Sequence, residues 1–354
     1  MKIFNCNQCG QLVYFENDHC ERCGFKLGFE SSELRLLTII ENDDSSFSLF
    51  HDRNRRFTYC YNHSYGICNW LVENGSGSDF CVACSLNHTI PDLAQPELFT
   101  RWKVIENAKH RLVYSLLRMK LPVVSKIIEP QTGLAFDFVS DNEKYSNGKI
   151  LTGHDNGLIT INISEADDIE REMTRRAMDE VYRTVLGHFR HEIGHYYWDR
   201  LIEKTAFLPE YRSLFGDETV DYSQALNKHY QSGPPPAWNL DYISAYATMH
   251  PWEDWAETWA HYLHILDTLE TAYVFGLSIH TNTVKNALNV EAHMEKDPYR
   301  LENFEDIISL WLPFTFAMNS INRSMGHADL YPFVIRPKVM EKLLFIHRVV
   351  NSAA

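Results

Sequence analysis

The stretch "GHFRHEIGHYYWDR", residues 187–200, contains His191, Glu192 and His195 in the pattern H-E-x-x-H. Residues four apart on an α-helix lie one turn apart, so both imidazoles would project from the same side of the helix. Two imidazoles placed in this way can bind one metal ion, and Glu192 would lie beside that ion. A histidine-rich surface helix without a metal ion can contain the same pattern. The rest of the sequence has to decide between a metal-binding helix and such a surface helix.

A later segment, "SAYATMHPWEDWAETWAHYLHIL" (244–266), offers a third ligand. Pro251 is suited to the first turn of a helix, and Glu253 and Glu257 would then lie one turn apart on one face. Several tryptophans surround these glutamates, and an unpaired carboxylate in an apolar environment is costly. Binding a cation removes this cost, whereas a solvated acidic stripe fits poorly with the tryptophans. The sequence therefore favours a metal-binding role for the two glutamates.

All eight cysteines of the chain lie within residues 6–84, which marks a separate N-terminal module. The first four have the spacing C-x2-C-x10-C-x2-C, and the second four combine C-x7-C with another C-x2-C turn. Because each set can surround one ion tetrahedrally, we expect two structural zinc sites with four thiolates each. The expected ligands are Cys6, Cys9, Cys20 and Cys23 in the first site and Cys60, Cys68, Cys81 and Cys84 in the second. His63 and His88 are close in sequence, but four cysteines leave no position for them.

Composition limits the class of protein. The chain has 354 residues, 45% of them hydrophobic, and a net charge of −14, so a general attraction to nucleic acid or anionic membranes is disfavoured. The longest apolar run, "IISLWLPFTFAM" (307–318), is too short to span a bilayer, and "MKIFNCNQCG" at the start has no signal-peptide core. We therefore expect a cytoplasmic protein without membrane contact. The basic cluster "DRNRR" (52–56) could bind a phosphate group or form a solvated face of the module. The acidic character of the module favours the solvated face.

The periodicity of the sequence predicts an α+β protein with two domains. Residues 1–95 would form a small β-rich zinc-ribbon module, and residues 96–354 a mainly helical domain with a small sheet. The helical pattern that starts at Ser164 is too long for one helix, so we expect a break near Gly187 or earlier. The other expected elements are strands within 34–40, 46–52, 133–139 and 157–163, a helix at 98–120 and a polar loop at 140–148.

Two resemblances to known families rest on these motifs. "HEIGH" followed by "YATMHPWEDWAE" resembles the gluzincin metallopeptidases, in particular those related to anthrax lethal factor. More broadly, the chain is similar to a bacterial family of zinc-binding metallopeptidases with an N-terminal zinc ribbon. The matching segments run from residue 6 to 266 and again over 331–347, and they include "CNQCG…CERCG", "CSLNHTIPDL", "TGHDNGLITINISEAD", "RHEIGHYYWDRL", "PWEDWAETWAHYLHI" and "YPFVIRPKVMEKLLFIH".

The resemblance to gluzincins implies roles for three residues of the later segment. Glu253 would be the third zinc ligand, Glu257 would support the ligands, and the Tyr246 hydroxyl would stabilise the oxyanion. Residues 96–354 would then form a zincin-like peptidase domain, in which Glu192 is the general base for a zinc-activated water. Asp199, one turn beyond His195, is a second candidate for orienting a ligand histidine, although a solvated carboxylate accounts for it equally well. We expect three zinc ions per chain, one catalytic and two structural.

The sequence leaves several points open. The segment Gly157, Leu158, Ile159 and Thr160 is either an edge strand that pairs with a substrate or a core strand. His188, His250, His261 and His264 lie near the expected site in sequence, and packing or capping roles are favoured for them. A peptide or protein is the expected substrate. The alternatives are a protease of the SprT-like type, directed to nucleic-acid-bound proteins, and a non-catalytic zinc-binding interaction protein. The oligomeric state is left undecided.

Overall fold

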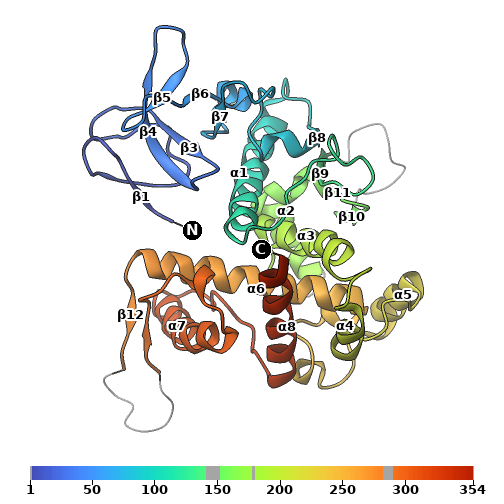
Figure 1. Ribbon diagram of the computed structural model, residues 1–354. Helices are drawn as coiled ribbons and strands as arrows, with labels where there is room; N and C mark the ends of the chain where they lie inside the picture. Colours follow the sequence, from blue (N-terminus) through green and yellow to red (C-terminus); the bar gives the residue numbers. More distant parts are fainter. Residues whose placement is uncertain (1, 141–151, 178–179, 282–289, 354) are drawn as a thin grey trace. The chain divides into compact units, whose positions relative to one another are not determined.

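The computed structural model describes residues 2–140, 152–177, 180–281 and 290–353 (Figure 1). These form two compact units, Met1–Thr174 and Arg175–Ala354. The predicted α+β class is confirmed, because the N-terminal region is β-rich and the C-terminal region is mainly helical with small sheets. The division into units falls later than the predicted domain boundary after residue 95, and that boundary stays a prediction. Of the loop predicted at 140–148, all but the first residue lies outside the described residues.

The N-terminal unit contains an antiparallel sheet of five strands in the order β3-β4-β5-β6-β7. Strands β4 and β5 match the expected strands at 34–40 and 46–52. The alternating apolar residues of this sheet form a small core of Leu37, Ile39, Phe47, Leu49, Phe57 and Leu71. The strands of this region are β1 (Phe4–Asn5), β2 (Leu12–Val13), β3 (Leu27–Glu30), β4 (Arg35–Glu41), β5 (Phe47–Leu49), β6 (Arg56–Tyr59) and β7 (Leu71–Glu73).

A long helix, α1 (Pro96–Arg118), packs against this β-rich region within the same unit. Its apolar residues recur every three or four positions, so one face of the helix is buried. The ring of Tyr114 on that face lies 5.4 Å from the ring of Phe15 and 6.1 Å from that of Phe29. These aromatic contacts join α1 to the region that carries the cysteines.

A second sheet has the strand order β10-β11-β9-β8 and corrects one expectation. Strand β11 (Leu158–Asn162) pairs with β10 (Gly153–Asp155) on one side and with β9 (Ala135–Val139) on the other, while β8 (Asn87–Thr89) lies at the far edge. Of the two possibilities left open for Gly157, Leu158, Ile159 and Thr160, the edge strand for substrate is therefore contradicted, and the segment lies inside the sheet. Ile159 and Ile161, two apart in the strand, point to the same face of the sheet, and both are fully buried.

The second unit is built from helices. The long helical pattern that starts at Ser164 breaks between α2 (Asp168–Ala177), which crosses the division between the units, and α3 (Val185–Leu201), as expected. The Thr184 side chain caps α3 by accepting a hydrogen bond of 2.9 Å from the Gly187 amide. The other helices and strands of this unit are α4 (Leu208–Phe215), α5 (Tyr222–Ser232), α6 (Pro251–Val274), α7 (Phe304–Ser324), α8 (Pro337–Ala353), β12 (Ser278–Ile279) and β13 (Ala292–His293). Among the described residues, no helix is both long and apolar enough to cross a membrane.

Helices α3 and α6 pack closely because Gly194 has no side chain. A Cβ atom at this position would lie 3.0 Å from Ala256 Cα and 3.2 Å from Trp259 Cβ. The indole nitrogen of Trp255 also donates a hydrogen bond of 2.8 Å to the Gly194 carbonyl oxygen. The central helix α6 (Figure 1) begins at Pro251, where the His250 ring accepts a hydrogen bond from the Trp252 amide. This packing places the H-E-x-x-H helix directly against the helix that carries the two glutamates.

Candidate metal centre

Three side chains from α3 and α6 meet at one point. His191 Nε2 lies 3.2 Å from His195 Nε2 and 2.9 Å from Glu253 Oε2. His195 Nε2 lies 3.5 Å from Glu253 Oε1. The ligands of a tetrahedral zinc ion with bonds of about 2.0 Å lie about 3.3 Å apart, so the three donor atoms are arranged as such an ion requires.

The electrostatics of this cluster also suit a cation. Glu253 is 2% exposed, and its buried Oε2 atom has the His191 Nε2 atom, at 2.9 Å, as its neighbour. Burial raises the pKa of Glu253, but the two histidines outweigh burial and hold this pKa well below its ordinary value. Burial lowers the pKa of His191, but Glu253 and Glu257 outweigh it and hold this pKa well above its ordinary value. The residues present therefore favour a positive charge at this point, and their donor set fits zinc.

Glu257 orients one of the candidate ligands. Its Oε1 atom lies 2.8 Å from His191 Nδ1, on the opposite side of the imidazole from the metal-facing nitrogen. Its Oε2 atom accepts a hydrogen bond of 2.6 Å from the Ser244 hydroxyl, which fixes the carboxylate in turn. A carboxylate on Nδ1 selects the tautomer that leaves Nε2 free to bind a metal. Sequence reasoning did not find Ser244, which lies before α6 and is brought to Glu257 only by the fold.

Two residues with expected chemical roles lie close to this cluster. Glu192 is 8% exposed, and its burial raises the pKa of its carboxyl group. The ring of Tyr246 lies 6.1 Å from the ring of His191, and burial, then Glu253, raise the pKa of its phenol. A carboxylate with a raised pKa is a better proton acceptor, and a phenol with a raised pKa stays a hydrogen-bond donor at neutral pH.

A second tyrosine at the cluster was not anticipated from the sequence. Tyr222, at the start of α5, donates a hydrogen bond of 2.8 Å to Glu253 Oε1. Its ring lies 5.3 Å from the ring of His250 and 6.4 Å from that of Trp252. Tyr222 precedes Glu253 by a long segment and belongs to no local motif, so the sequence carried no signal for this contact.

The two cysteine sets are assembled as predicted from their spacing. In each set the four sulfur atoms lie within 4.8 Å of one another. Cys6 and Cys23 are 3.6 Å apart, as are Cys9 and Cys20, and Cys68 lies 3.8 Å from Cys81. Zinc–sulfur bonds of about 2.3 Å place tetrahedral ligands about 3.8 Å apart, which agrees with these separations.

A buried network of charged residues from α1 lies beside the second cysteine set. His110 Nε2 lies 3.5 Å from Cys84 Sγ, and its Nδ1 lies 2.6 Å from the Glu106 carbonyl oxygen. Lys109 and Glu106 are fully buried and form an ion pair of 2.9 Å. A four-thiolate zinc site carries net negative charge, so a buried lysine nearby compensates it. The sequence contained a signal for this network, because Glu106, Lys109 and His110 are polar residues on the otherwise apolar face of α1.

Five histidines that lie near these sites in sequence have structural partners. His63 Nδ1 lies 2.8 Å from the Cys68 carbonyl oxygen, and His88 Nδ1 lies 2.7 Å from Asp137. His250 caps α6, and burial lowers the pKa of His261 to about 4, so that its neutral ring pairs with the Tyr331 hydroxyl at 2.8 Å. His264 Nδ1 lies 2.7 Å from Arg190 Nη1. Asp199 lies partly exposed on the last turn of α3, whereas Glu257 is the residue that holds His191.

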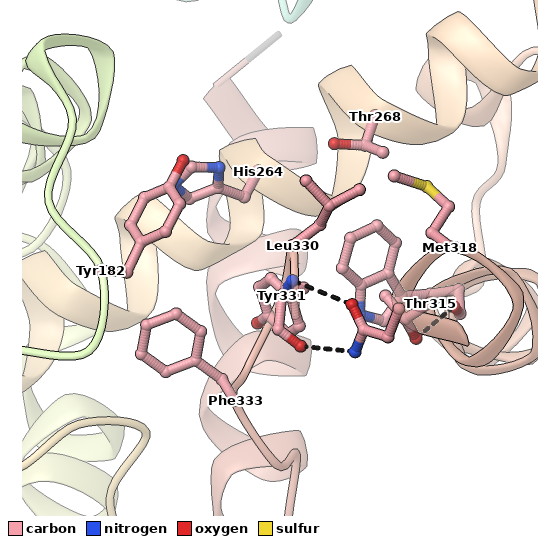
Figure 2. A pocket seen from close by; sticks show the side chains of 10 residues that line it. Tyr182, His264, Thr268, Thr315, Met318, Leu330, Tyr331 and Phe333 are labelled. Atoms are coloured by element: carbon pink, nitrogen blue, oxygen red, sulfur yellow. Dashed lines mark hydrogen bonds between the residues drawn. The ribbon is translucent and has the colours of Figure 1, made fainter. Parts of the chain in front are cut away.

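A cavity of about 160 Å³ lies further along α6 (Figure 2). Its walls combine the aromatic rings of Tyr182, Trp311, Tyr331 and Phe333 with aliphatic side chains. Asn319 also lines the cavity. Its side-chain amide forms two hydrogen bonds, of 2.9 and 3.1 Å, with the backbone of Tyr331. None of the three candidate metal ligands lines this cavity, which is large enough for one aromatic ring.

Comparison with known proteins places the chain in a family. A family model described as "Putative zinc-binding metallo-peptidase" matches residues 98–349. The chain belongs to this family. A second model, of a zinc-ribbon domain, matches residues 3–95, which contain both cysteine sets. Family membership supports zinc binding and a metallopeptidase role.

The chain also has full-length relatives. One protein from Mycobacterium bovis and two from strains of Mycobacterium tuberculosis, each named only as uncharacterized, are 44% identical to it over 356 residues. The matches cover 100% of this chain and 96% of each relative, so the ribbon and the peptidase region occur together in them. No solved structure matches the chain.

Proposed function

We propose that this protein is a zinc-dependent peptidase of the gluzincin type, with His191, His195 and Glu253 as metal ligands. The observation that carries the proposal is the convergence of these three donor atoms, at separations of 2.9, 3.2 and 3.5 Å. The family match to zinc-binding metallopeptidases over residues 98–349 supports the same reaction class. Three protein ligands leave one tetrahedral position for water, as catalytic rather than structural zinc sites do.

Each further residue has a defined role in this proposal. When bound, zinc lowers the pKa of a water molecule and polarises the carbonyl group of the substrate. Glu192 accepts the proton of the attacking water and passes it to the leaving amine. The Tyr246 hydroxyl donates a hydrogen bond to the developing oxyanion. Glu257, held by Ser244 at 2.6 Å, keeps the His191 ring in one tautomer and one orientation.

The zinc-ribbon sites are structural in this proposal, which gives three zinc ions per chain. The sheet that joins the two cysteine sets has only a small core, so metal binding would supply much of its folding energy. Each set uses four thiolates and leaves no open position for water. We assign the ribbon a role in recruiting or gating the substrate, which we expect to be a peptide or protein.

The basic cluster 52–56 argues against a nucleic-acid target, because two of its three arginines are paired within the ribbon. The Arg55 guanidinium contacts Glu30 at 3.0 Å, Glu33 at 3.1 Å and Glu73 at 3.2 Å. Arg56 donates a hydrogen bond of 2.6 Å to the Ser48 hydroxyl. Because these two guanidinium groups are already paired within the ribbon, and the net charge is −14, a phosphate backbone finds little free positive charge here.

The test is a comparison of the zinc-loaded protein with its Glu192→Gln variant on a library of peptides, read by mass spectrometry. We expect the wild type to cleave and the variant to keep its zinc but lose cleavage by at least about a hundredfold. His195→Ala and Glu253→Ala should lose both activity and one zinc ion. Glu203→Gln, with its partly exposed carboxylate just beyond α3, is the matched control and should cleave like the wild type. Cleavage that survives Glu192→Gln would contradict the mechanism.

A further inference from the structure

The two-stranded ladder β12–β13 and the residues directly next to it carry three side chains that can bind a metal ion. The strands are antiparallel, with Ser278 opposite His293. Continuing this register by two residues places His280 opposite Glu291. Because residues two apart in a strand point to the same side, His280, Glu291 and His293 share one face of the ladder.

Exposure along the strands shows that this face is open to solvent. Ala292 and Met294 are 2% and 6% exposed, whereas Glu291, His293 and His280 are all exposed. The rings of His280 and His293 lie 4.8 Å apart between centroids. The potential donor atoms of the two imidazoles and the carboxylate all lie within 4.8 Å of one another. A small rotation of exposed side chains brings such atoms to the separation that a bound ion requires.

We infer that His280, Glu291 and His293 form a further metal site, selective for divalent transition ions such as zinc or nickel. Two imidazoles and one carboxylate suit these ions, whereas calcium and magnesium prefer oxygen ligands alone. The site shares no residue with the two cysteine sets or with His191, His195 and Glu253. Because its ligands are exposed and only three in number, it exchanges its ion more readily than the cysteine sites do.

Calorimetric titration of the full-length, zinc-loaded protein with zinc chloride, after dialysis to remove weakly bound ions, tests this site. We expect one additional equivalent of zinc to bind to the wild type, and its affinity to fall at least about tenfold in His293→Ala and in His280→Ala. His327→Ala removes an exposed histidine outside the cluster and should bind like the wild type. The inference is overturned if the wild type binds no additional zinc, or if both ligand variants bind it unchanged.

A second inference comes from the contact between Tyr222 and Glu253, and it rests on the metal centre of the proposed function. Tyr222 is the first residue of α5, and the Asp221 carboxylate fixes this helix start by accepting a hydrogen bond of 2.7 Å from the Gln224 amide. The residue Tyr222 is 37% exposed, while its hydroxyl reaches inward to Glu253 Oε1 at 2.8 Å. The other oxygen, Oε2, is buried and faces the proposed ion position, 2.9 Å from His191 Nε2.

The structure assigns Tyr222 the role of a positioning residue for the Glu253 ligand. A carboxylate can offer a metal ion one oxygen or both. A phenol hydrogen bond occupies Oε1, so Oε2 becomes the oxygen that is available for the ion, and the position of the carboxylate is fixed before the ion arrives. This role differs from that of Tyr246, whose hydroxyl we assign to the oxyanion of the substrate.

Competition with a chelator tests the assignment without any measurement of hydrolysis. Tyr222→Phe removes only the hydroxyl, and we expect it to lower the affinity of the zinc ion that is lost in Glu253→Ala by about 10–100-fold. Tyr230 lies on the same helix and is 63% exposed, so Tyr230→Phe is the matched control and should leave this affinity unchanged. Equal melting temperatures of the two variants would show that the fold is intact.

The outcomes separate this assignment from the proposed function. If Tyr222→Phe binds the ion as tightly as the wild type does, the positioning role is overturned, whatever the peptidase activity. If its zinc affinity falls while the wild type cleaves no peptide, the positioning role stands and the peptidase proposal fails. A parallel Tyr246→Phe variant should keep the zinc affinity of the wild type and lose turnover, which distinguishes the two tyrosines.

Discussion

Replacing Gly194 by alanine tests whether the close approach of α3 and α6 builds the metal centre. The new methyl carbon would lie 3.0 Å from Ala256 Cα and 3.2 Å from Trp259 Cβ, where carbon atoms normally stay about 3.5 Å or more apart. Backbone atoms of α6 are among the contacts, so the helices must separate by a few tenths of an ångström. Overpacking of this kind costs about 1–3 kcal/mol.

The higher helix propensity of alanine partly offsets this loss of stability in Gly194→Ala. Alanine is favoured over glycine inside a helix by about 1 kcal/mol, so Gly194→Ala should destabilise the protein by about 0–2 kcal/mol. The helix propensity of alanine does not compensate for the effect of Gly194→Ala on zinc binding. His191 and His195 move with α3 while Glu253 stays with α6, and a shift of this size should weaken zinc binding by about tenfold.

Two measurements on the same samples separate these effects. Urea unfolding at a fixed free zinc concentration gives the change in unfolding free energy, and competition with a chelator gives the change in zinc affinity. Gly194→Ser, with a larger side chain, should show a greater loss in both. If Gly194→Ala were more stable by about 1 kcal/mol and bound zinc as the wild type does, the claim that this glycine positions the ligands would be refuted.

Three further predictions concern other parts of the chain. Ser244→Ala removes the hydrogen bond of 2.6 Å to Glu257, and chelator competition should show at least about a tenfold weaker zinc centre, with the fold unchanged. Lys342→Met leaves the buried Asp254 without its partner at 2.6 Å, and urea unfolding should show a loss of about 3–5 kcal/mol. Lys338→Met, a control at an exposed ion pair on the same helix, should change stability by less than about 0.5 kcal/mol. Removal of all zinc by a strong chelator should unfold the ribbon, seen as loss of its near-ultraviolet circular dichroism, and readdition of zinc should restore it.

The parts of the site that could be predicted from the sequence are those set by local geometry. His191 and His195 are one helical turn apart whatever the rest of the fold does, and the same holds for Glu253 and Glu257. The cysteine sites follow from turns in which two thiolates are only a few residues apart. In each case the spacing itself fixes which side chains share a face, so no knowledge of packing was needed.

The remaining features depend on contacts between distant segments. Tyr222 reaches Glu253, and Lys342 reaches Asp254, only after α5 and α8 have packed in their places. The strand at 157–163 could be found from the sequence, but whether it lies at the edge or inside the sheet could not, because an apolar run does not say how many neighbours a strand has. Gly194 lies within the motif "HEIGH", but the sequence alone does not show why a glycine is needed there. The reason is the close contact with Ala256 and Trp259 of α6.

Anomalous diffraction at the zinc absorption edge, from crystals of the full-length protein, would show directly where zinc binds. We expect a peak within bonding distance of His191 Nε2, His195 Nε2 and a Glu253 oxygen, together with one peak inside each cysteine set. The cysteine peaks serve as an internal standard for zinc loading. Full peaks at both cysteine sets with no peak between the two histidines and Glu253 would contradict the claim that these residues form a zinc centre.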